Sequence, residues 1–204
     1  MTIRVWDPAL RLFHWALVGA FALAWLTSEE GRSLHETAGY VVAGLIGFRL
    51  VWGLVGPRYA RFAQFVPGPG RLLSYAGDML KGRERRYVGH NPAGAAMIVA
   101  LLLSLSGTAL TGWLSAEPAR MAYLPSAPAL VSVARADEAG GYGEGGEGSE
   151  GGLKDLHGAL ANLTLLLVGL HVAGVALSSL RHRENLARAM VTGRKRAPEG
   201  DDIA

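Results

Sequence analysis

Apolar residues in this chain are gathered into four long blocks that alternate with polar segments. The blocks cover residues 10–28, 36–56, 92–114 and 153–180. Each is close to the length of about 20 apolar residues that crosses a bilayer as a helix. Because half of the 204 residues are apolar and they concentrate in these blocks, the pattern predicts an all-α fold. We expect a multi-pass transmembrane four-helix bundle within residues 1–199.

The first block also has features of a secretory signal. Arg4 and Arg11 precede its apolar run, and residues 22–24 resemble a cleavage site. We favour a retained span, because cleavage would discard His14.

Basic residues are distributed unevenly among the segments between the blocks. Fifteen of the 20 Lys and Arg residues lie before or at the start of the first block, between the second and the third, or after the fourth. With four spans these segments share one side, and the positive-inside rule places that side in the cytoplasm. We therefore expect both termini in the cytoplasm and a basic cytoplasmic tail over residues 181–204. Interleaved with spans, these segments indicate topology and contact with anionic lipid, and no nucleic-acid partner.

The two long connections differ in character. Segment 115–152 becomes rich in Gly and Glu from residue 137, without apolar periodicity, so we predict a periplasmic loop that is disordered from there. Segment 56–91 mixes aromatic and aliphatic residues with arginines, which predicts a short amphipathic helix on the cytoplasmic face. The chain has no cysteine, which excludes disulfides, thiolate metal sites and Cys-ligated iron–sulfur clusters.

Two histidines in the fourth block share one face of its helix. His157 and His171 are fourteen residues apart, a spacing that returns to within roughly 40° of the same face and advances about 21 Å. The topology places His157 near the outer side and His171 near the inner side. His35, at the start of the second span, is then outer, and His14, early in the first, is inner. Depth therefore matches His35 with His157 and His14 with His171.

Paired histidines at two depths indicate two metal cofactors. Two imidazoles on opposite sides of one iron are the axial ligands of a six-coordinate, electron-transferring haem. One tetrahedral metal site does not fit ligands about 21 Å apart. A cation transporter would instead place carboxylates within the spans. Glycines that leave room for flat macrocycles, or for close helix packing, are Gly39, Gly44, Gly47, Gly107 and Gly112.

Two arginines are candidates to bind haem propionates. Arg11 lies one turn before His14, and Arg49 lies fourteen residues after His35, on nearly the same helix face but at the inner level. A guanidinium binds a carboxylate through two parallel hydrogen bonds. Arg49 within a span is costly unless it is paired, although its side chain could also extend to the interface.

Several motifs resemble the bacterial cytochrome b561 family, which includes the b-type cytochrome subunit of nickel hydrogenases. They are Val5-Trp6-Asp7-Pro8, Arg11-Leu12-Phe13-His14-Trp15, His35-Glu36-Thr37-Ala38-Gly39-Tyr40, Arg49-Leu50-Val51-Trp52-Gly53, Gly89-His90-Asn91-Pro92 and the paired histidines of the fourth span. The resemblance implies a four-helix bacterial inner-membrane protein with two b haems, ligated by His14, His35, His157 and His171. It also implies electron exchange with quinone in a respiratory chain.

Three functions follow from this resemblance and from the residues. The first is electron transfer between the quinone pool and a periplasmic or membrane redox partner, such as a cytochrome c. The second is a membrane anchor for a hydrogenase-like complex. The third is an oxidoreductase that passes electrons from superoxide to quinone, with Arg32 or Lys154 attracting the anion. Whether the chain is an enzyme in its own right is left open.

Two further histidines are not expected to be ligands. His90 precedes Asn91, a good N-cap, and Pro92, a good first helical residue, so it marks a helix start at the inner surface. A quinone or proton-handling role for His90 is the less favoured alternative. His182 follows the fourth span between two arginines and is expected in the interfacial tail.

Overall fold

The computed structural model describes residues 1–29, 31–117 and 147–203 and is mostly helical. The larger part of the predicted disordered stretch falls outside these residues. The elements in chain order are β1 (Thr2–Arg4), α1 (Pro8–Leu26), α2 (Arg32–Val55), η1 (Arg58–Ala60), α3 (Phe62–Phe65), α4 (Pro69–Leu80), α5 (Pro92–Ala116), α7 (Glu147–Arg181), α8 (Leu186–Thr192) and β2 (Arg194–Arg196).

Four of these helices, α1, α2, α5 and α7, are long and apolar enough to cross a membrane. Their bounds lie close to those of the predicted spans. The start of α5 follows from local chemistry, because the Asn91 side chain accepts a hydrogen bond from the Gly94 amide at 2.7 Å. Asp7 acts in the same way on α1, where it accepts from the Leu10 amide at 3.0 Å. Pro8 and Pro92 occupy the first turns.

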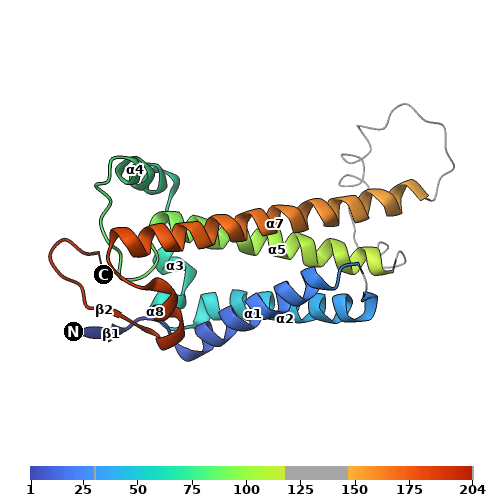
Figure 1. Cartoon of the computed structure of the whole chain (residues 1–204), viewed down its shortest axis with the longest axis horizontal. Coiled ribbons are helices and arrows are strands. Elements are labelled where there is room, and N and C mark those ends of the chain that lie inside the picture. Colours follow the sequence, from blue (N-terminus) through green and yellow to red (C-terminus); the bar gives the residue numbers. More distant parts are fainter. Residues whose placement is uncertain (30, 118–146, 204) are drawn as a thin grey trace.

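The four long helices run side by side along the long axis of the molecule (Figure 1). Helix α1 packs on α2, α2 on α5, and α5 on α7. Both chain termini lie at one end of this bundle, together with α3, α4, α8 and the two strands. We call this the terminal end. The other end carries the connection between α1 and α2, and we call it the opposite end.

The terminal end contains the main cluster of buried apolar side chains. Its members are Val5, Trp6, Leu10, Phe13, Ala60, Val88 and Ala189. They come from before α1, from α1 itself, from η1, from the segment before α5 and from α8. The amphipathic helix predicted in segment 56–91 is present as α4, which buries Tyr75 and exposes Leu73 and Leu80.

The tail beyond residue 181 is folded onto the terminal end. Strand β2 pairs antiparallel with β1, which adds a small sheet to the helical fold. Arg86, buried ahead of α5, forms ion pairs with Glu184 at 2.9 Å and with Asp202. Lys195 lies 3.5 Å from the same Glu184 carboxylate. A buried ion network, which the sequence pattern did not reveal, therefore attaches the tail.

We predict that Arg86→Met releases the tail. The substitution leaves the carboxylates of Glu184 and Asp202 buried without their shared guanidinium, and breaking a buried ion pair costs about 3–5 kcal/mol. Trypsin should then cleave at Arg194–Arg196 much faster than in the wild-type chain. Glu199→Gln is the control, because the Glu199–Arg196 pair is exposed and contributes little. Equal cleavage rates in the two variants would refute a role for the network.

The same network gives the tail a defined pH dependence. Burial alone would raise the pKa of Glu184, but hydrogen bonds from Arg86 and the Arg196 amide outweigh it and lower the pKa. Burial also opposes the shift at Asp202, where bonds from the Glu199 amide and Arg86 again lower the pKa. Stabilisation from these groups is therefore complete above their unfolded pKa values of about 4.3 and 3.9. It is lost as the pH falls through the lower folded values.

Candidate cofactor-binding site

His35 of α2 and His157 of α7 come together near the opposite end of the bundle. Their ring centroids are 6.0 Å apart and their planes are inclined at 82°. A nitrogen of imidazole binds a metal ion at about 2 Å. The centroid separation of His35 and His157 therefore leaves room for one metal ion between the rings. It is close to the sum of two metal–nitrogen bonds and the two distances from a ring centroid to its nitrogen.

The Nδ1 atom of each ring is held by a backbone carbonyl. His35 Nδ1 lies 2.8 Å from the Ala24 oxygen and His157 Nδ1 lies 2.9 Å from the Thr108 oxygen. Because a carbonyl only accepts, each Nδ1 must carry the proton, and each Nε2 keeps its lone pair. A carbonyl partner on the far nitrogen is the usual support of a metal-binding histidine. These two residues thus fit an axial ligand pair.

Gly112 explains how His157 reaches a carbonyl within α5. A Cβ atom at position 112 would lie only 2.8 Å from His157 Cε1. In the α-helix the Gly112 amide bonds the Thr108 oxygen, so the missing side chain leaves that oxygen open to the imidazole. Gly107 similarly faces Leu160. For these two glycines, close helix packing is the correct interpretation.

The glycines of α2 have different surroundings. A Cβ built at Gly39, Gly44 or Gly47 would have no described atom outside its own helix backbone and adjacent residues within 4 Å. Gly39 lies one turn after His35 and therefore on the same face of α2. A flat macrocycle held by His35 could lie against this glycine face.

We predict that Gly112→Leu abolishes cofactor binding at His157. The new side chain would displace the imidazole and separate Nδ1 from the Thr108 carbonyl. The expected result is loss of a haem signal from the reduced-minus-oxidised visible spectrum. Gly77→Leu is the control, since Gly77 lies in α4, outside the four long helices, and a Cβ there meets nothing within 4 Å. An unchanged spectrum in Gly112→Leu would refute the role of this glycine.

His14 of α1 and His171 of α7 lie nearer the terminal end. They are close enough to interact electrostatically, and both are half-buried. The Nδ1 atom of His14 is buried, with no hydrogen-bond partner among the described residues. His14 thus differs from His35 and His157, whose Nδ1 atoms are each hydrogen-bonded to a backbone carbonyl. The role of His14 and His171 as a ligand pair stays a prediction.

Arg49 is deeply buried in α2, with 2% of its surface exposed. Its guanidinium lies over the Phe62 ring at 4.5 Å from the centroid, and Nη1 has no hydrogen-bond partner within the described parts of the chain. Gly53 makes this arrangement possible, because a Cβ there would lie 2.0 Å from the Phe62 ring. A buried guanidinium with a donor to spare fits the predicted partner of a carboxylate.

Arg11 and His90 make contacts with distant residues that the sequence did not predict. The Arg11 Nη1 donates to the Val191 carbonyl, so Arg11 connects α1 to α8. Its predicted role toward a propionate stays a prediction. His90 does precede a helix start, but its ring is enclosed between Trp6 and Phe65, at 4.6 and 4.5 Å between centroids.

The chain is similar to known proteins over most of its length. Residues 5–193 match the family described as prokaryotic cytochrome b561. The chain belongs to this family. It is a multi-pass membrane protein, and its family consists of b-type cytochromes that bind haem b and transfer electrons.

One relative is a "Probable Ni/Fe-hydrogenase B-type cytochrome subunit" from Rhizobium leguminosarum bv. viciae. It is 29% identical over an alignment of 140 residues, which covers 55% of this chain and 59% of the relative. The chain thus spans less than two thirds of that protein. No solved structure shows significant similarity to the chain.

The signature residues of this cytochrome b561 chain have structural roles that sequence reasoning missed. Asp7 caps α1 and also accepts a hydrogen bond from Trp52 Nε1 at 3.3 Å, which links α1 to the end of α2. Trp6 packs on His90. The capping pattern of Asp7-Pro8 was available in the sequence, whereas its second partner, 45 residues away, was not.

Proposed function

We propose that this chain binds two b haems and carries electrons across the bacterial inner membrane. His35 and His157 hold the haem near the opposite end, and His14 and His171 hold the haem near the terminal end. The observation that best supports this proposal is the geometry of His35 and His157. Their ring centroids are 6.0 Å apart, and the Nδ1 atom of each ring is hydrogen-bonded to a backbone carbonyl. Haem supplies a one-electron couple when bound.

The chain's own residues position the cofactors and seal them. If His14, His35, His157 and His171 all serve as ligands, no ligand position would be left for oxygen, and the haems would transfer electrons only. The carbonyls of Ala24 and Thr108 orient the imidazole rings of His35 and His157. His157 and His171 lie about 21 Å apart along α7. This one helix therefore contributes a ligand to each of the two proposed haems.

A haem count tests the proposal directly. The purified chain should contain two haems per polypeptide and give a low-spin b-type spectrum when reduced. One haem per polypeptide, or a high-spin five-coordinate spectrum in a fresh preparation, would contradict the assignment of two axial pairs.

We propose further that the terminal end faces the cytoplasm. It carries both termini in Figure 1 and most of the basic residues outside the helices. A reporter enzyme that works only in the periplasm should therefore be inactive when fused after Ala204. The same reporter inserted between residues 130 and 131 should be active. The reversed result would invert the orientation.

For the physiological role, we propose exchange between the quinone pool and a periplasmic or membrane redox partner. The named relative favours, as a second candidate, a membrane subunit that accepts electrons from a hydrogenase-like complex. A third candidate is oxidation of superoxide by the isolated chain. Arg32 and Lys154, which are exposed at the opposite end near His35 and His157, would attract the anion. Rapid haem reduction by superoxide favours that activity, whereas reduction only by a protein partner favours a subunit role.

A further inference from the structure

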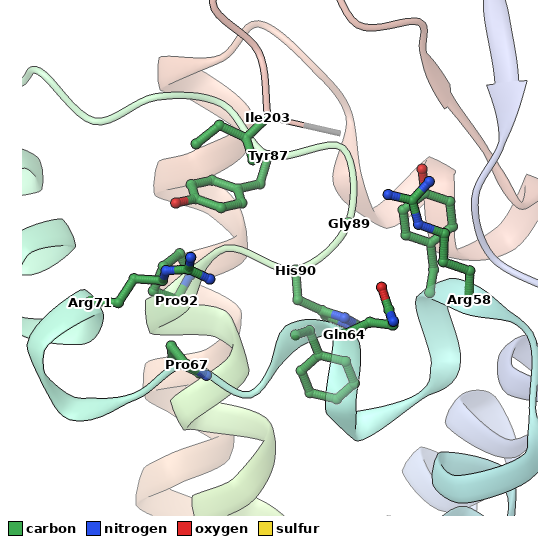
Figure 2. Close-up of a pocket in the computed structure, with 11 residues that line it drawn as sticks. Arg58, Gln64, Pro67, Arg71, Tyr87, Gly89, His90, Pro92 and Ile203 are labelled. Atoms are coloured by element: carbon green, nitrogen blue, oxygen red, sulfur yellow. The ribbon is translucent and has the colours of Figure 1, made fainter.

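A pocket of about 180 Å³ opens at the terminal end, between η1, α3, α4 and the segment before α5. Polar side chains in its lining include Arg58, Gln64, Arg71 and His90. In the view of Figure 2, Arg71 and Arg58 lie on opposite sides of His90. The lining thus includes two arginines that come from different elements, Arg58 from η1 and Arg71 from α4.

The charge around the pocket has one sign. Among the described residues that line it, none is Asp or Glu. Two further cations that do not line the pocket, Arg49 and Lys195, act electrostatically on His90. Burial first, and then these cations, lower the pKa of His90 to about 3. The imidazole is therefore neutral, and the surrounding potential favours an anion.

The surroundings of the pocket also include apolar side chains open to the exterior. Leu73, two residues after Arg71, is 73% exposed, and Val66 is 47% exposed. Leu80 follows Leu73 by seven residues and so lies on the same face of α4. Exposed apolar residues beside basic ones are typical of a helix that lies at a membrane interface. A pocket beside such a helix would lie at the level of lipid phosphate groups.

We propose that this pocket binds a phosphate group through Arg58 and Arg71. A planar guanidinium binds phosphate oxygens through paired, charge-assisted hydrogen bonds. The phosphate can belong to the headgroup of an anionic phospholipid or be free inorganic phosphate. Arg58 stays placed for this contact by its position over the Tyr59 ring, at 5.6 Å from the centroid. None of the four predicted haem ligands lines this pocket.

Binding can be measured by calorimetry on the full chain, purified in neutral detergent and freed of lipid. The probes are short-chain phosphatidylglycerol, the diacylglycerol with the same chains but no phosphate, and inorganic phosphate at constant ionic strength. Arg58→Gln with Arg71→Gln should weaken phosphate-dependent binding by about tenfold or more, since each lost charge-assisted bond is worth at least that factor. The matched control is Arg61→Gln with Arg83→Gln, two exposed arginines outside the lining.

The probes separate the two sources of phosphate. Binding of phosphatidylglycerol alone assigns a lipid headgroup, and binding of inorganic phosphate assigns free phosphate; either supports the site if only the Arg58/Arg71 variant loses it. Diacylglycerol binding as tightly as phosphatidylglycerol, no binding by any probe, or equal loss in the control variant would overturn the proposal. If the Arg58/Arg71 variant does not fold, binding is measured on Ile203→Trp instead. This substitution fills the pocket without removing a charge, so it should also weaken phosphate-dependent binding.

Discussion

Replacing His35 or His157 with alanine should remove one haem per chain and leave the other spectrally intact. The centroids of these two rings lie 6.0 Å apart, and loss of either ring would remove one of the two imidazoles that would hold the haem. His14→Ala and His171→Ala should remove the other component. The measurement is the reduced-minus-oxidised spectrum at low temperature, together with the haem-to-protein ratio of each purified variant.

The pairing itself is what these four variants test. His182→Ala is the control, and both haems should be retained, because His182 lies beyond the end of α7. His90→Ala should also retain both. If His14→Ala and His157→Ala removed the same spectral component, the assignment by depth would be wrong. Loss of one component from His35→Ala and the other from His157→Ala would contradict the outer pair specifically.

Arg49→Gln should lower the midpoint potential of the inner haem by about 60 mV or more, which corresponds to about 1.4 kcal/mol for one electron. The sign follows from charge, because a nearby cation stabilises the reduced state, which holds one more electron. The effect is expected to be large because Arg49 is 2% exposed and is therefore weakly screened by water. A potentiometric titration that resolves the two haems is the measurement.

Two further variants separate charge from packing at this position. Arg49→Lys keeps the charge but loses the planar contact with Phe62, so the potential should recover in part. Arg61→Gln removes an exposed charge and should leave both potentials unchanged. An Arg49→Gln variant that shifts both haems equally, or neither, would show that Arg49 does not act on the inner haem.

The number, type and approximate limits of the membrane helices could be predicted from sequence. Membrane length sets a minimum apolar run, and Asn91-Pro92 marked the start of α5 through its own side-chain chemistry. Helix α2 begins at Arg32, four residues before the predicted span 36–56. Helical hydrogen bonds can continue into polar residues at the interface, so hydrophobicity marks the membrane and not the end of the helix.

The sequence by itself determined which histidines could share a level, because helix rise and topology convert residue numbers into depth. Only the tertiary structure decided how each imidazole is held. The Ala24 carbonyl that meets His35 belongs to the last turn of α1, and the Thr108 carbonyl that meets His157 is open because Gly112 has no side chain. Backbone oxygens are the same at every position in a sequence. Which of them is exposed to a neighbouring ring depends on helix rotation and packing, and these are set by contacts between distant residues.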